Sequence, residues 1–272
     1  MNVSRLAPMH DFYAPLSSYT QDQADGLRRM FAGQQRRVLP LVANPHVAFS
    51  SVVLDRLAAV LSASGRQVLV VDAAGASPPA HEMAALDLAA CVESVSPGVQ
   101  YLPARGLPMS YVDTRGCASR FIDAVQDAAP RSEVILLHAD AQDLARILKR
   151  QVARPVLIGA DHPESIKHAY AGAKLLATRC SLLTFDLLLA ASPQSPRAAA
   201  IAQSLAGCAE TFLGALMCHT ALIDPATEST APPDQALSAL LLAQLALDDT
   251  ARAPGLGRAL ARPASTARFA HP

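Results

Sequence analysis

The chain has 272 residues, of which 51% are hydrophobic, so it can bury the core of one α/β domain with tails. Lys and Arg (23) balance Asp and Glu (23), which excludes the basic excess typical of a general nucleic-acid-binding protein. No apolar run reaches the length of a membrane span, and the N-terminus lacks the apolar region of a signal peptide. We therefore expect a cytoplasmic protein.

Residues 1–36 predict a flexible leader with one short helix. Thr20 can cap a helix over residues 21–31, and Gln23, three residues later, completes a capping box. Arg28 and Arg29 lie near its other end, where the helix dipole favours cations. A helix of this length is marginal alone and needs a surface to pack on.

From residue 37 onward, apolar strands alternate with helical stretches. Strands that are apolar throughout are typical of a parallel sheet buried on both faces. We therefore predict one α/β domain over 37–224, with a mostly parallel sheet, helices on both faces and right-handed crossovers. The predicted strands are 38–43, 67–73, 99–104, 133–139, 155–160, 181–190 and 211–217, and the predicted helices are 51–64, 117–129, 140–150, 163–177 and 196–209.

Residues 225–272 predict three further parts. A polar, Pro-rich linker (225–235) leads to a Leu/Ala-rich helix (234–248), and the end of the chain from 251 has the composition of a disordered tail. The helix lacks the Lys and Arg that anionic lipid would favour. We therefore expect it to pack on the domain, with at most weak contact with a membrane.

Neither the cysteines nor the segment with His162 and His168 has the spacing of a metal site or a disulfide pair. The five cysteines are scattered without a CxxC pair, which predicts free and mostly buried thiols. Asp161, His162, Glu164 and His168 lie close in sequence, but the two histidines are spaced so that they do not share a helix face. Pro163 more simply marks the start of a helix with Asp161 or His162 as its cap. We predict no metal site.

The turn after the first strand is where an α/β protein of this kind binds phosphate. A phosphate-binding loop needs glycines for close backbone approach, N–H groups that face the phosphate, and a lysine. The loop 43–50 reads ANPHVAFS, without glycine or lysine. Pro45 lacks an N–H and Phe49 is apolar, whereas Ser50 could still ligate magnesium. His46 could contact an anion, although a turn histidine without a role is the simpler interpretation.

The segment 38–73 resembles the opening of MinD/ParA-type ATPases, where the loop GKGGVGKT separates a strand from a helix and a second strand ends in Asp. In that register the signature lysine of the family falls on Asn44, and its phosphate-binding lysine falls on Phe49. The glycines of the family fall on Ala43, Pro45, His46 and Ala48.

Three later positions of the same family differ as well. The family has an Asp-x-Asp whose second Asp orients the attacking water; here Asp72 is present and Ala74 takes the second place. Its magnesium-associated Asp falls on His138, and its adenine-contacting Asn falls on Ala190. The resemblance thus implies a degenerate site: no ATP hydrolysis, no ATP or magnesium as cofactor, and no ATP-dependent dimer.

Residues 22–28 (DQADGLR) match the motif DQAxxLR at every specified position. This motif resembles that of the FlhG/FleN (YlxH-like) flagellar number regulators, where it lies in an N-terminal helix ahead of the ATPase domain. The similarity extends over residues 20–225 and includes YLPARG (101–106) and the helix 163–176. It implies that the helix engages FlhF, a signal-recognition-type GTPase, and stimulates its GTP hydrolysis.

The spacing of the motif is compatible with such a partner. After Asp22, the residues Gln23, Ala24, Leu27 and Arg28 share one helix face, with Ala24 permitting close approach and Leu27 providing an apolar anchor. Gln23 could position a water beside a phosphate, and Arg28 could pair with a carboxylate of the partner. Periodicity alone favours an ordinary leader helix docked on its own domain, but the full motif match favours the partner helix.

Together these features predict a regulator of flagellar number or placement that acts through an FlhF-type GTPase and a flagellar transcriptional activator. Recruitment to the cell pole or the membrane surface would follow from such a role. Two alternatives stay open: a MinD/ParA-type ATPase with an atypical loop, and a pseudo-ATPase scaffold in another polar-localisation or secretion system.

Overall fold

The computed structural model describes residues 36–149 and 151–251, and within them eight strands form one sheet in the order β3-β4-β2-β5-β1-β6-β7-β8. All neighbouring strands are parallel except β3 and β4. The strands are β1 (Arg37–Val42), β2 (Val68–Asp72), β3 (Glu93–Ser96), β4 (Val99–Pro103), β5 (Val134–Ala139), β6 (Val156–Ala160), β7 (Thr184–Ala190) and β8 (Leu216–Ile223). This architecture confirms the predicted fold class.

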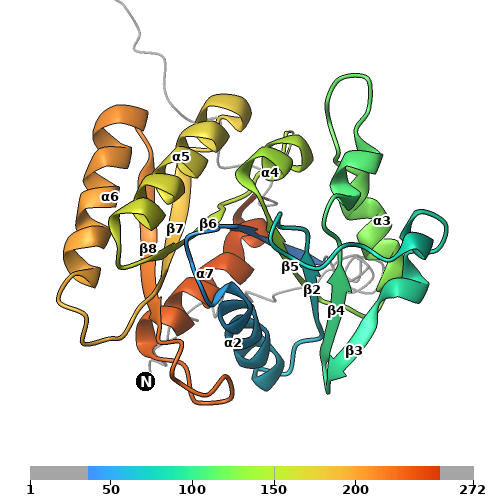
Figure 1. Ribbon diagram of the computed structural model, residues 1–272, viewed down its shortest axis with the longest axis horizontal. Helices are drawn as coiled ribbons and strands as arrows, with labels where there is room; N and C mark the ends of the chain where they lie inside the picture. The colour runs from blue at the N-terminus through green and yellow to red at the C-terminus, as the bar shows by residue number, and fades with distance from the viewer. Residues whose placement is uncertain (1–35, 150, 252–272) are drawn as a thin grey trace, which may run out of the picture. The chain divides into compact units, whose positions relative to one another are not determined.

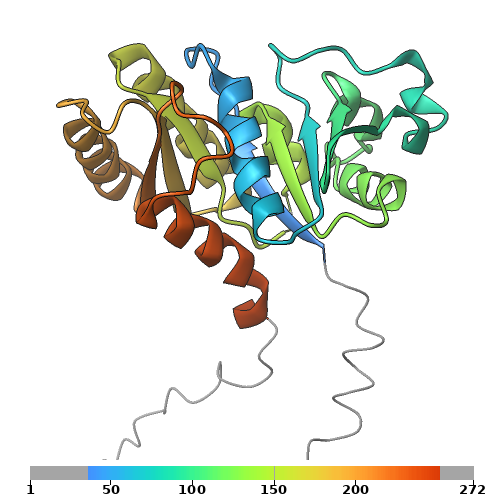
Figure 2. The ribbon, with the colours of Figure 1, turned by 90° about the horizontal axis from the view of Figure 1, so that it is seen from below.

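Helices cover both faces of the sheet, because the strands bury apolar side chains in both directions. Figure 1 shows α4, α5 and α6 on one face, and α2 and α7 on the other, which Figure 2 shows from below. The helices are α2 (Ser50–Ala63), α3 (Arg120–Ala128), α4 (Ala141–Ile147), α5 (Pro163–Cys180), α6 (Ala198–Leu213) and α7 (Gln235–Ala251), with three short 3₁₀ helices at Glu82–Ala85, Ala89–Cys91 and Leu107–Tyr111.

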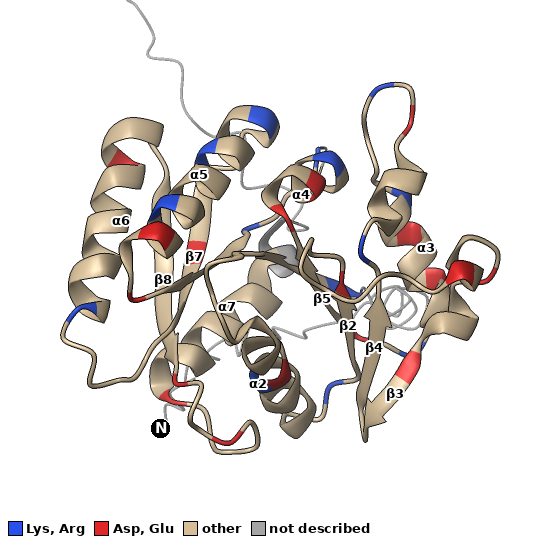
Figure 3. Cartoon of the chain, viewed as in Figure 1, with Lys and Arg blue, Asp and Glu red and all other residues tan. Residues whose placement is uncertain are grey.

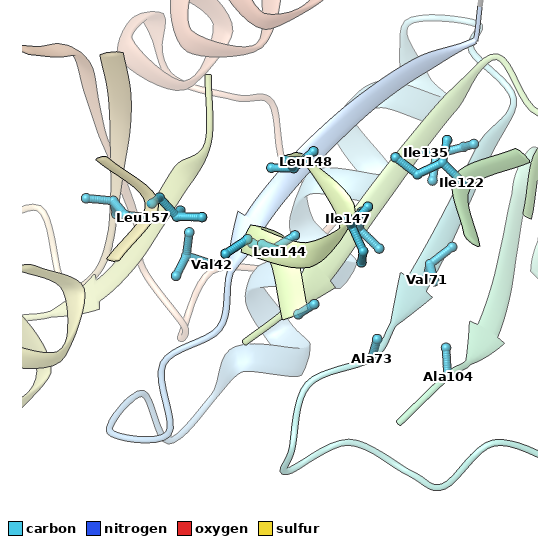
Figure 4. Close-up of a cluster of buried hydrophobic side chains, with 14 of the residues drawn as sticks. Val42, Val71, Ala73, Ala104, Ile122, Ile135, Leu144, Ile147, Leu148 and Leu157 are labelled. Atoms are coloured by element: carbon cyan, nitrogen blue, oxygen red, sulfur yellow. The ribbon is translucent and has the colours of Figure 1, made fainter. Parts of the chain in front are cut away.

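The short helix α4 shows how this packing fixes the loops at the carboxyl ends of the strands. Its residues Leu144 and Ile147 and its C-cap residue Leu148 lie over the central strands, with Val42 of β1 and Ile135 of β5 in the same cluster (Figure 4). These side chains are almost fully buried. Burial of each side chain of this size stabilises the fold by about 2 kcal/mol, so α4 is held firmly although it is only two turns long.

Pro40 lies in the centre of the sheet, where a proline is rarely tolerated. The N–H groups of Arg37 and Ala43 bond to β5, so the alternation of a parallel strand points the nitrogen of Pro40 towards β6. The pairing with β6 begins only at Leu41. The missing N–H of Pro40 therefore falls just before the start of that ladder and leaves no acceptor of β6 unpaired.

Three sequence-based expectations were wrong. The predicted strand 211–217 instead contains the end of α6, with Gly214 as its left-handed C-cap (φ +63°), and the strand β8 begins only at Leu216. The exposed edge strand β3 was missed because ESVS carries no apolar pattern. The cysteines are free as predicted, but only Cys91 is buried and Cys218 is exposed.

The segment after β8 is not a free linker, because Arg56 of α2 holds it. The guanidinium of the buried Arg56 donates to the carbonyl oxygens of Ser229 (2.8 Å), Ala231 and Pro232 (2.9 Å). The helix α7 then packs on the sheet through Leu237, Leu240 and Leu241, as predicted.

The leader and its DQADGLR motif lie outside the described residues, as does the end of the chain after residue 251. Among the helices of the described residues, none is long and apolar enough to cross a membrane.

Replacement of Arg56 by alanine should lower the free energy of unfolding by about 3 kcal/mol, because charged hydrogen bonds to several carbonyls are lost. Urea unfolding measures this change. Arg66→Ala is the matched control, since the Arg66–Glu133 pair (3.0 Å) is exposed and should be worth less than about 1 kcal/mol. Equal effects of the two substitutions would contradict a structural role for the Arg56 contacts.

Candidate functional site

The candidate site lies at the carboxyl ends of β2, β5 and β1, which are neighbours in the sheet. The connections after these strands and one face of α5 enclose a pocket of about 760 Å³, lined among others by Asn44, Ser50, Asp72 and His138. Strand order reverses at β1, because β2 follows on one side of it and β6 on the other. Such switch points are where open parallel sheets bind ligands.

Asn44 begins the loop between β1 and α2 and fastens it to the neighbouring elements. Its side-chain amide donates to the carbonyl oxygens of Ile158 and Ser165 (both 2.8 Å) and to the hydroxyl oxygen of Ser165 (3.0 Å). Its carbonyl oxygen accepts the N–H of His46 at 3.1 Å. Asn44 is only 4% exposed. The amide is thus fully engaged within the protein, and the loop is held without a ligand.

The other predicted loop residues separate into two groups. Pro45 and Ser50 line the pocket, whereas His46 and Phe49 do not. Phe49 is the N-cap residue of α2, makes no side-chain cap and is 58% exposed. The side chain of Phe49 therefore points to solvent and not into the pocket.

His46 instead belongs to a group of three histidines. Its ring centroid lies 5.7 Å from that of His168 and 6.4 Å from that of His162, and its carbonyl oxygen accepts the Nε2–H of His162 at 2.8 Å. Burial, and then the proximity of His46, lowers the pKa of His168. These contacts hold the loop against the start of α5.

His162 has the predicted capping role. Its Nδ1 accepts the N–H of Ser165 at 3.4 Å, and Pro163 is the first residue of α5. Asp161 accepts the hydroxyl of Ser195 at 2.8 Å. Among the described residues, the structure contains no group of three or more His, Cys, Asp or Glu side chains that could hold a metal ion.

Asp72 is the centre of a buried hydrogen-bond network. Its Oδ1 lies 2.7 Å from Nδ1 of His138 and also accepts the hydroxyl of Ser77, while its Oδ2 accepts the Tyr101 hydroxyl at 3.3 Å. Asp72 and His138 are direct partners in the register of β2 and β5, so their side chains lie on the same face of the sheet. Both oxygens of the carboxylate are therefore occupied by groups of the protein itself.

This network shifts the pKa values of two of its groups. Burial alone would raise the pKa of Asp72, but hydrogen bonds from His138 and Ser77 outweigh it, and the pKa lies below its ordinary value. Burial and the adjacent Asp72 carboxylate raise the pKa of the Tyr101 hydroxyl. Asp72 is thus an ionised carboxylate that accepts three hydrogen bonds.

His138 carries a nitrogen that the fold leaves unsatisfied. The residue is 3% exposed, and in the described part of the chain its Nε2 has no hydrogen-bond partner. His138 also lines the pocket, so this unsatisfied nitrogen lies at or next to the candidate site.

The charges of the pocket are unlike those of a phosphate site. Its lining residues include the carboxylates Asp72 and Asp140 but no lysine or arginine. Figure 3 shows no charged residue in the loop between β1 and α2. Asp140 accepts the N–H of Gly75 at 3.2 Å, and Ala74 is buried. The end of β7 at Ala190 does not line the pocket.

Sequence reasoning named Asp72 and His138 separately but missed Ser77, Tyr101 and Ser165. No local pattern marks these residues, because they become partners only through the loop after β2, the pairing of strands or the packing of α5. The one usable signal was a polar residue, Asp72 or His138, at or next to the end of each of two apolar strands.

Substitution of Asn44 by alanine should lower the free energy of unfolding by about 2 kcal/mol, because buried carbonyl groups lose their donor. The exposed amide of Gln194 gives a control, since Gln194→Ala should change stability by less than about 0.5 kcal/mol. Chemical denaturation of both variants measures the difference, and a neutral Asn44→Ala would show that the amide does not hold the loop.

The lowered pKa of Asp72 makes stability depend on pH. The ionised form is favoured in the fold, so its contribution is full above the ordinary pKa of aspartate and is lost as the pH falls through the folded pKa. Wild type should therefore lose more unfolding free energy than Asp72→Asn between about pH 7 and about pH 3. Thermal unfolding across that range tests this, and parallel losses in the two proteins would disprove the pairing.

Comparisons with known proteins support the fold and no finer identity. No family model and no curated protein sequence matches the chain. Among solved structures, a MinD cell division protein from Aquifex aeolicus is 10% identical with a TM-score of 0.50, and the match covers 78% of this chain and 97% of that one.

Two further structures are similar. A putative plasmid partition protein from Borrelia burgdorferi bound to AMPPNP is 7% identical with a TM-score of 0.54, covering 79% of this chain and 99% of that one. A cobyrinic acid a,c-diamide synthase from Mycobacterium smegmatis, with an ATP analogue and magnesium, is 17% identical with a TM-score of 0.52, covering 80% and 97%. The chain thus has the MinD/ParA-like α/β fold of P-loop ATPases.

Proposed function

We propose that the chain is a regulator of flagellar biosynthesis, of number or placement, which acts by binding an FlhF-type GTPase and has lost ATP hydrolysis. The observation that carries this proposal is the closed hydrogen-bond network at the carboxyl ends of β1, β2 and β5. The polar groups of Asn44 and Asp72 are hydrogen-bonded to other groups of the protein.

The first support is the poor fit of Mg·ATP to the pocket. Phosphate groups would face Asp72 and Asp140 without a lysine or arginine among the lining residues. Like charges a few ångströms apart repel strongly in a partly buried site. A magnesium ion would also compete with His138, Ser77 and Tyr101 for the Asp72 carboxylate. No catalytic step through ATP follows from these residues.

The second support is the DQADGLR motif of residues 22–28, which is complete in the sequence. A protein that retains a partner motif beside a degenerate nucleotide site keeps the interaction and dispenses with the nucleotide switch. In this proposal the chain acts in the cytoplasm and reaches the cell pole or the membrane surface through its partner. A flagellar transcriptional activator is a second expected partner.

Calorimetry of the full chain with Mg·ATP should give no binding heat, because the site lacks cations for the phosphates. A dissociation constant tighter than about 10 μM, equivalent to about 7 kcal/mol, would contradict the proposed loss. If ATP were also hydrolysed, and Ser50→Ala or Asp72→Asn abolished the hydrolysis, the chain would be an ATPase with an atypical loop.

Added to an FlhF-type GTPase, the full chain should raise its rate of GTP hydrolysis, and Gln23→Ala should abolish the increase. The neighbouring Gln21→Ala is the matched control because Gln21 lies outside the motif. Arg28→Ala should weaken binding at least about tenfold, as expected for loss of a charged hydrogen bond, whereas Arg29→Ala should not.

Unchanged stimulation by Gln23→Ala would show that this helix is not the activator. Absence of any binding to the GTPase would favour the third possibility, a pseudo-ATPase scaffold in another polar-localisation or secretion system.

A further inference from the structure

The pocket beside Asp72 and His138 is large enough for a small organic molecule, at about 760 Å³. Much of its wall is formed by small apolar residues, namely Ala43, Pro45, Val47, Ala74, Ala171 and Leu175. Such a wall stabilises an apolar ligand body by removing it from water. The polar groups of the pocket then decide which functional group the ligand carries.

An ion of either sign meets one unfavourable charge at the pocket. The carboxylates Asp72 and Asp140 repel an anion, and no lysine or arginine among the lining residues offsets them. A cation would lie at the N-terminus of the fourteen-residue helix α2, where Ser50 and Ser51 line the pocket and the helix dipole is positive. An uncharged ligand meets neither penalty.

His138 supplies the specific contact. Its Nδ1 lies 2.7 Å from the Asp72 carboxylate, which can only accept, so Nδ1 carries the proton. The other ring nitrogen, Nε2, is buried and has no partner among the described residues. An unsatisfied buried polar atom costs about 1–3 kcal/mol. A ligand that makes a hydrogen bond to this nitrogen would recover this free energy.

A hydroxyl group suits both polar elements, because it can donate and accept. It can make a hydrogen bond with Nε2 of His138, and its oxygen can accept an N–H from the first turn of α2, where these groups have no partner within the helix. We propose that the pocket binds an uncharged, mainly apolar molecule that carries a hydroxyl group, and that this molecule regulates the protein in place of a nucleotide. The regulatory part rests on the proposed function, whereas the binding itself does not.

Four small molecules that share a benzene ring and differ in its substituent test the ligand class: benzyl alcohol, toluene, benzoate and benzylamine. With ¹⁵N-labelled full-length protein, benzyl alcohol should shift the Nε2 resonance of His138. It should also bind at least about tenfold more tightly than each of the other three, since one satisfied buried hydrogen bond is worth about that factor.

Two variants assign the site. His138→Phe keeps a ring but removes Nε2, and it should weaken benzyl alcohol about tenfold. Ala171→Phe fills the pocket from an exposed position of α5 and should abolish binding. This variant still tests whether the alcohol binds in the pocket if His138→Phe does not fold. Ala200→Phe, at an exposed position of α6 outside the pocket, is the matched control and should bind as wild type does.

Equal or tighter binding of benzoate, benzylamine or toluene would overturn the ligand class. Failure of benzyl alcohol to bind, or binding that Ala171→Phe leaves unchanged, would overturn the site. These outcomes are separate from the proposed function: the alcohol can bind even if the GTPase is not stimulated. If both occur, addition of the alcohol should change GTPase stimulation by wild type and not by Ala171→Phe.

Discussion

The parallel register between β2 and β5 is the constraint on which the candidate site depends. It places Asp72 directly beside His138 at the carboxyl ends of two buried strands. A buried carboxylate is costly unless it is paired and hydrogen-bonded. Here one imidazole and two hydroxyl groups satisfy it. The pairing that stabilises the sheet thus also determines that this carboxylate is engaged without a metal ion.

The loop between β1 and α2 is likewise held by contacts within the protein. In a phosphate-binding loop, backbone N–H groups and a lysine face the ligand, and the ligand completes their hydrogen bonds. In this chain Asn44 bonds to β6 and α5, and His46 packs against two histidines near the start of α5. Phe49 faces solvent. The loop is held by contacts with the rest of the domain, so its conformation needs no anion.

The hydrogen-bond networks of Asp72 and Asn44 give this MinD/ParA-like fold a pocket unlike a phosphate-binding site. Small apolar side chains, two carboxylates and a histidine with one unsatisfied imidazole nitrogen meet at the carboxyl ends of β1, β2 and β5. Since a fold hosts many functions, the similarity to ATPases constrains the architecture and not the ligand. The polar groups of the site carry the functional argument.

The sequence predicted the alternation of strands and helices well, because continuous apolar strands leave little freedom of interpretation. It failed at β8, where the apolar run TFLGALM reads as a strand although Gly214 ends a helix within it. The apolar residue types at Phe49 and Ala74 were visible from the sequence alone. The partners of Asp72 were not, since Tyr101 and His138 reach it only when three strands adopt their register, and Ser77 only through the fold of the loop after β2. The hydrogen bonds of Arg56 could not be predicted from the sequence either, because their acceptors are backbone carbonyl groups far away in the chain.

The most direct test of this account is the ¹⁵N spectrum of the His138 imidazole, recorded with and without Mg·ATP. The hydrogen-bond network predicts a proton on Nδ1, which faces the Asp72 carboxylate, and resonances that do not change when Mg·ATP is added. An Nδ1 without a proton, or resonances that move on addition of Mg·ATP, would contradict the central claim that groups of the protein itself engage Asp72.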